Sequence, residues 1–177
     1  VDHDGYEDIL IGMDNYDDSG QDEGAVFVYY GSETGPSTTY SWMARGEATY
    51  AHFGLSAASA GDVNYDGYDD IIVGTLENYL TEQPHVYVWY GGPGGLGDDG
   101  LPSNADWTAT NPNPGTSCFG AMVGGIEDVN GDSYDDIMIG AHCYDGAVTN
   151  QGAVFVYYGS ASGLGSPGTP TNADWMA

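Results

Sequence analysis

An acidic loop, Asp62-Val63-Asn64-Tyr65-Asp66-Gly67-Tyr68-Asp69-Asp70, recurs along this chain. It returns as Asp128-Val129-Asn130-Gly131-Asp132-Ser133-Tyr134-Asp135-Asp136, and a truncated copy, Asp2-His3-Asp4-Gly5-Tyr6-Glu7-Asp8, lies at the start of the sequence. Oxygen-bearing side chains occupy loop positions one, three, five and nine. A short turn with hard oxygens at this spacing can direct several of them at one centre, as Ca²⁺ requires. The loop therefore predicts a metal-binding repeat.

Other motifs recur in step with the loop. The equivalent residues Asp4, Asp66 and Asp132 are spaced by 62 and 66 residues. Residues 24–32 return almost unchanged at 152–160, and a diverged copy stands at 85–91. Several motifs that repeat in a fixed order indicate one structural unit of roughly 60 residues.

Each unit predicts four short β-strands and no helix. The first strand runs from a Phe-Gly pair into the loop, as in 53–60, and the second follows the loop at 70–74. The third is an alternation of Val, Phe and Tyr, and the fourth carries a Trp. β-Branched and aromatic residues at period two, separated by Gly, Pro and Asn, favour strands. We predict an all-β fold, a β-propeller with four strands per blade. Independent hairpins and a β-solenoid are the alternatives.

The chain divides into fewer than three complete units. Residues 1–44 would hold strands two to four of a partial blade, and residues 45–109 and 110–177 would each form a complete blade. The result is an incomplete set of about three blades within one repeat array. We expect either that the chain is a piece of a longer one, or that several copies complete each other in trans, since open sheet edges invite strand pairing.

The motifs together resemble the FG-GAP repeat, which builds the β-propeller of integrin α chains and of many microbial extracellular proteins. That family combines Phe-Gly, an Asp-rich calcium loop, an Ile/Val strand ending in Gly-Ala-Pro, and a Gly-Ala-Val-Tyr-Val-Tyr strand. The resemblance covers essentially the whole chain. It departs at the Pro, which no copy keeps, and at Ser133, which stands where Gly is usual and predicts a slightly strained turn. The resemblance implies a propeller that is stabilised by calcium.

We expect each loop to bind Ca²⁺ through its side chains at positions one, three, five and nine and the backbone carbonyl of position seven. The second and third loops supply complete sets and predict two sites, and the N-terminal loop predicts a third that lacks position one. A metal-free Asp/Asn/Gly turn is the alternative. The expected ligands are Asp62, Asn64, Asp66, Tyr68 and Asp70; Asp128, Asn130, Asp132, Tyr134 and Asp136; and Asp2, Asp4, Tyr6 and Asp8.

The two cysteines flank one predicted hairpin. Cys118 stands before its first strand and Cys143 after its second, so antiparallel pairing would return both to the same end. We predict a disulfide, which implies an oxidising compartment. Two free, partly buried thiols are the alternative. His142 and Cys143 could also be interpreted as a zinc pair, but two ligands do not make a zinc site.

Composition restricts the partners. The 177 residues include one Lys or Arg against 27 Asp and Glu, for a formal net charge of −26. Three bound Ca²⁺ would bring this to about −20. Without a basic patch, nucleic-acid binding and docking on anionic lipid are disfavoured. No apolar run reaches the length of a membrane span, so we expect no membrane insertion.

The sequence indicates a secreted or cell-surface protein that is not an enzyme. We expect a calcium-stabilised extracellular propeller module for adhesion or for interaction with protein or glycan, whose partners include other blades of the same or neighbouring chains. One alternative is a subunit of an extracellular filament or surface layer, assembled through blade-to-blade contacts. Another is the non-catalytic scaffold domain of a secreted hydrolase. The Tyr and Trp residues of the third strands could line a sugar-binding surface or pack between blades.

Overall fold

The computed structural model describes residues 1–76, 85–111 and 118–177. Within these ranges the chain forms short strands and a single turn of 3₁₀ helix, η1 (Pro102–Asn104). None of the described residues belongs to a helix that is long and apolar enough to cross a membrane. The strands are β1 (Ile9–Met13), β2 (Ala25–Tyr29), β3 (Trp42–Arg45), β4 (Ser56–Gly61), β5 (Asp70–Gly74), β6 (His85–Trp89), β7 (Pro93–Leu96), β8 (Trp107–Thr110), β9 (Phe119–Gly125), β10 (Ile137–Ala141), β11 (Ala153–Tyr157), β12 (Ala161–Leu164) and β13 (Trp175–Met176).

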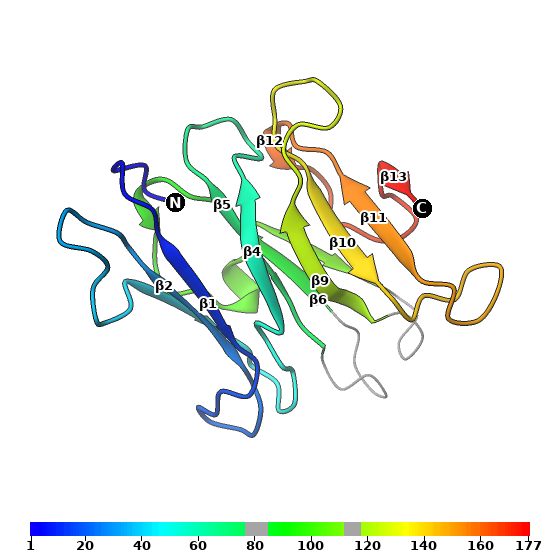
Figure 1. The fold of residues 1–177 in the computed structure, drawn as a ribbon. Coiled ribbons are helices and arrows are strands. Elements are labelled where there is room, and N and C mark those ends of the chain that lie inside the picture. The colour runs from blue at the N-terminus through cyan, green and yellow to red at the C-terminus, as the bar shows by residue number, and fades with distance from the viewer. Residues whose placement is uncertain (77–84, 112–117) are drawn as a thin grey trace.

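Three antiparallel sheets follow one another along the chain (Figure 1). Their strand orders are β1-β2-β3, β4-β5-β6-β8 and β9-β10-β11-β13. The first sheet contains strands two to four of a blade, and the other two contain four strands each. The prediction of an all-β, incomplete β-propeller is therefore confirmed. The boundaries proposed between units, at 44/45 and 109/110, stay a prediction.

The sheets share one register, because the same alternation of apolar residues recurs in each. Ile71 of β5 lies opposite Trp89 of β6, and Ile137 of β10 lies opposite Tyr157 of β11. The second strand of the middle blade spans 70–74 as predicted. The first strand was predicted too long in this blade, because β4 begins only at Ser56. Phe53 instead forms an isolated bridge to Gly24 of the preceding blade, and Gly54 turns the chain with a φ of 83°.

The core lies between blades. The first blade packs Val26, Val28 and Trp42 against the second blade's Tyr87 and Trp89. Tyr87 and Trp89 are only 6% and 3% exposed, and Tyr157, between the second and third blades, is 3% exposed. A sugar-binding surface is therefore the wrong interpretation for these three rings, which serve as interblade core. Burial of large aromatic side chains is a major stabilising contribution to such a core.

Polar contacts repeat between successive blades. The Trp42 indole Nε1 donates to the Asp98 carbonyl at 2.8 Å, and the Trp107 indole Nε1 donates to the Ser166 carbonyl at 3.0 Å. Strands β7 and β12, which the sequence did not predict, lie in the connections that make these contacts. In these connections the Leu96 N–H donates to the Tyr30 hydroxyl, and the Leu164 N–H donates to the Tyr90 hydroxyl. One indole bond and one hydroxyl bond therefore recur at each of the two contacts between blades.

Glu23 lies in the β1–β2 connection and accepts hydrogen bonds from the Ser19 backbone N–H (2.9 Å) and hydroxyl (2.8 Å). Hydrogen bonds from the backbone of Gly20 and Ser19 lower the pKa of Glu23 to about 2. A lowered folded-state pKa contributes stability above the unfolded pKa, and this stability is lost as the pH falls through the folded one. At pH 7 we expect the melting temperature of the wild type to be higher than that of Glu23→Gln, and we expect this difference to disappear as the pH falls from 4.5 to 2. A constant difference measured by calorimetry across that range would contradict the assignment.

Candidate metal-binding loops

The three acidic loops lie along one edge of the array, at the top of Figure 1. The second joins β4 to β5 and the third joins β9 to β10, so each is the turn of a hairpin between the first and second strands of its blade. The N-terminal loop precedes β1. The second and third loops therefore follow from the same local pattern: a strand, a turn rich in Asp, Asn and Gly, and a second, apolar strand.

The second loop folds around its own side chains. The Asp62 carboxylate accepts the backbone N–H groups of Asp66 (2.9 Å) and Gly67 (2.8 Å). The Asn64 Oδ1 accepts from the Asp66 N–H at 3.1 Å, and the Asp66 Oδ1 accepts from the Tyr68 N–H at 3.0 Å. Positions one, three and five thus turn toward the interior of one tight loop.

The third loop repeats this arrangement. The Asp128 carboxylate accepts from the backbone N–H groups of Gly131 (2.6 Å), Asp132 (3.1 Å) and Ser133 (2.8 Å), and hydrogen bonding, chiefly from Ser133, lowers its pKa. Asn130 and Asp132 bond as their counterparts do. Ser133 has a φ of 78°, which agrees with the predicted strain at this position.

The ninth position of each complete loop is buried in the blade. Asp70 accepts the Val63 N–H at 2.9 Å and the Gly91 N–H at 2.8 Å, one on each oxygen. Asp136 accepts the Val129 and Gly159 N–H groups in the same way. Burial raises the pKa of Asp70 to about 7, and burial also raises that of Asp136. These carboxylates were expected to complete the metal sites. Each of their oxygens accepts one backbone N–H and keeps a second lone pair that is not used in that bond.

The N-terminal loop keeps part of the pattern. Asp2 accepts the Asp4 N–H at 3.2 Å, and Asp4 accepts the Tyr6 N–H at 2.9 Å. Asp8 accepts the Gly31 N–H and the Val1 nitrogen, each at 2.9 Å, as the other ninth-position residues do in their loops. The loop therefore has the fold of the other two without their first position.

Donor chemistry fits a hard cation in all three loops. Carboxylate, amide and carbonyl oxygens are the ligands that Ca²⁺ takes. Among the described residues, however, no three carboxylates of one loop have ligand atoms within 4.8 Å of one another. When the ligand atoms of His, Cys, Asp and Glu are all considered, the one described group of three at this distance is Cys118, His142 and Cys143. Position nine still lies close enough for the charges at positions one and five to add to the rise in the pKa of Asp70 and of Asp136.

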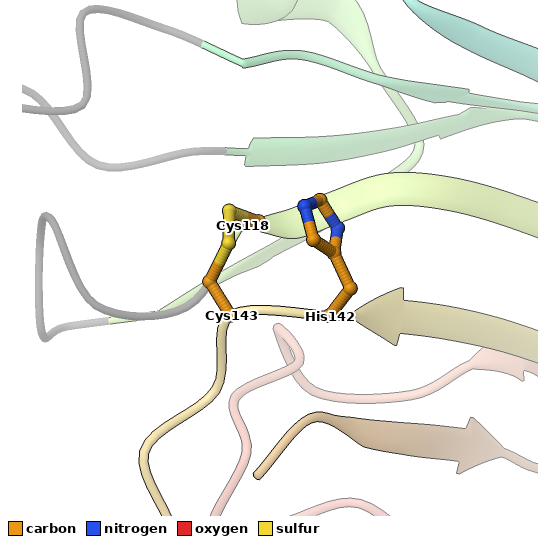
Figure 2. A group of neighbouring side chains, drawn as sticks. All are labelled: Cys118, His142 and Cys143. Atoms are coloured by element: carbon orange, nitrogen blue, oxygen red, sulfur yellow. A yellow bond between two sulfur atoms is a disulfide. The ribbon is translucent and has the colours of Figure 1, made fainter. Parts of the chain in front are cut away.

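That close group contains a disulfide (Figure 2). Cys118 and Cys143 are joined, with their Cα atoms 5.3 Å apart, and the bond ties the start of β9 to the end of β10. The His142 ring lies beside the sulfurs. Zinc is bound by thiolates, and both sulfurs here are bonded to each other, so the structure supports the predicted disulfide and not the zinc interpretation.

Successive antiparallel sheets, with an acidic loop between the first and second strands of each four-stranded one, define a β-propeller repeat protein of an acidic-loop type. The model of the FG-GAP repeat matches residues 53–89 and 119–157. These two segments, in the second and third blades, are therefore FG-GAP repeats.

Integrin alpha chains are similar to most of this sequence. Integrin alpha-5 of Xenopus laevis is 32% identical over 159 residues, which cover 87% of this chain. Integrin alpha pat-2 of Caenorhabditis elegans and integrin alpha-PS2 of Drosophila melanogaster are each 33% identical and cover 80% and 82% of it. The chain spans only 15%, 12% and 11% of the length of these three relatives.

Proposed function

We propose that this chain is a non-enzymatic, calcium-stabilised propeller module of an extracellular or cell-surface protein that serves in adhesion. The observation that carries the proposal is the acidic loop itself. The second and third copies differ in sequence only at their fourth and sixth positions, and they adopt the same network of hydrogen bonds, with oxygen at the same positions. The similarity to integrin alpha chains supports the adhesive use.

Calcium has a structural role in this proposal. Side chains at positions one, three, five and nine and the carbonyl at position seven hold the ion, and the ninth carboxylate also fastens the loop to the blade. The ion offsets part of a formal charge of −26 where the acids are densest. Mg²⁺ suits such loops less well, because it requires stricter geometry and retains more water. Exposed Tyr6 and Tyr65, which lie within the loops, offer aromatic surface to a protein or glycan partner.

Calorimetric titration with calcium tests the proposal directly. We expect two well-bound ions per chain, and a third that binds more weakly because the first loop lacks position one. Asp66→Asn with Asp132→Asn removes the two strong sites. Glu33→Gln, which also removes one negative charge but lies outside the loops, leaves the number unchanged. Retention of both strong sites in the double variant would contradict the assignment of the loops.

A second candidate function is a subunit of a filament or layer that assembles through blade-to-blade contacts. Ile9 and Ile11 of β1 are 43% and 42% exposed. On the third blade, a hollow of about 760 Å³ is lined by residues that include Met122, Val154 and Ala177. Head-to-tail contact between two such sheets would generate fibres unless it closed.

Sedimentation over a range of concentrations distinguishes the two functions. Filament formation predicts concentration-dependent association in calcium that Ile11→Lys abolishes. A monomer at every concentration would leave the adhesion module as the better description.

A further inference from the structure

The second and third loops contact each other through Asp135, which does not belong to the expected ligand sets. The Asp135 carboxylate accepts the Asp62 N–H at 2.8 Å, and the Asp135 N–H donates to the Asp62 carbonyl at 3.2 Å. Asp135 is therefore bonded to both backbone polar groups of Asp62, the first position of the neighbouring loop. It is also adjacent in sequence to Asp136, the last position of its own loop.

A second connection runs through the β11–β12 turn. The Gly159 N–H donates to the Asp136 carboxylate and the next N–H, that of Ser160, donates to the Val63 carbonyl, both at 3.0 Å. A side chain at Gly159 would collide with the carbonyls of both Asp135 and Val63, so only Gly allows this approach. Above the backbone, the rings of Tyr65 and Tyr134 meet edge to face with centroids 5.9 Å apart.

These contacts make the order of one loop depend on the order of the other. We propose that the second and third loops form one cooperative cation-binding unit, in which Asp135 is the positioning residue that transmits order from the third loop to Asp62. The inference rests on the proposed calcium binding. An ion that fixes the third loop fixes Asp135 and Asp136, and the second loop then loses less conformational freedom when it binds its own ion. Positive coupling of this origin is reciprocal.

Repulsion between the two ions opposes the coupling but does not prevent the second ion from binding. Asp62, Asp66, Asp69 and Asp70 give the second loop four carboxylates, so a bound divalent ion leaves it with net negative charge. The neighbouring loop therefore still favours the approach of a cation. At physiological salt, screening over about 8 Å reduces what repulsion remains between exposed charges.

Calcium titration of the full chain by calorimetry tests the proposal with four variants. Asp132→Asn, which disables the third loop, is expected to weaken the second loop's affinity about fivefold or more, the lower end of ordinary allosteric coupling. Asp135→Ala has the same effect on the second loop. Asp135→Asn preserves the coupling, because the amide oxygen still accepts the Asp62 N–H. Asp69→Ala is the matched control: it removes the equivalent carboxylate, which is exposed, and leaves cooperativity intact.

Hydrogen exchange supplies a readout that does not depend on affinity. In Asp66→Asn, where the second loop's site is disabled, calcium in the third loop is expected to slow exchange of the Asp62 amide, and Asp135→Ala abolishes this protection. Equal losses in Asp135→Asn and Asp135→Ala would show a charge effect and overturn the proposal. Unchanged second-loop affinity in Asp132→Asn would overturn it too. Independent binding at both loops contradicts only the coupling, whereas no binding in wild type contradicts the proposed function itself.

Discussion

Removal of calcium by excess chelator is expected to lower the melting temperature by tens of degrees. An ion bound at a concentration 1,000 times its Kd stabilises the folded state by about 4 kcal/mol, so two sites contribute about 8 kcal/mol. In a domain of this size each kcal/mol corresponds to roughly 2–4 °C. The loss is large because the acids that surround each ion remain crowded at one edge of a chain with a formal charge of −26.

Differential scanning calorimetry with calcium, with chelator, and with chelator plus excess Mg²⁺ measures this effect. Mg²⁺ controls for simple neutralisation of charge and is expected to restore only a small part of the lost stability. Melting curves that superimpose in calcium and in chelator would show that the loops are metal-free turns.

Phe53→Ala is expected to destabilise the fold by about 3–5 kcal/mol, the usual cost of truncating a fully buried Phe. Phe53 is completely buried, and its ring lies 5.8 Å from that of Tyr87 and 6.0 Å from that of Trp89. It comes from the connection between the first two blades and closes the core between them. The loss is a large fraction of the 5–15 kcal/mol by which domains are ordinarily stable.

The midpoint of urea unfolding at a fixed, saturating calcium concentration measures the loss. Tyr65→Ala is the control: its side chain is 69% exposed, and its removal is expected to change stability by no more than about 0.5 kcal/mol. If Phe53→Ala unfolded at the same urea concentration as wild type, the interblade core would not depend on the Phe-Gly pair.

Local pattern was sufficient for the strands and the loops. The second strand of the middle blade, Asp70–Gly74, lies where the sequence predicted it, because a run of β-branched residues directly after a polar turn has few alternatives. The third strands follow from the same period-two alternation. Internal repetition then predicted the blade, because motifs that recur in a fixed order and at a nearly fixed spacing indicate one structural unit per repeat.

Contacts between blades could not be predicted in this way. Asp62 and Asp135 are 73 residues apart, and Trp42 and Asp98 are 56 apart; no periodicity within one unit indicates such pairs. The sequence placed Asp70 among the metal ligands from its spacing alone, whereas the fold turns its carboxylate toward the backbone of Val63 and Gly91.

The sequence by itself therefore determined most of the strands, the repeat and the acidic chemistry of the loops, because each depends on residues close together in the chain. Tertiary structure decided which aromatic rings are buried, which carboxylates hold the backbone of another segment, and how one loop reaches the next. Those outcomes depend on the packing of one blade against another, where the partner of each residue is set by the geometry of the whole array.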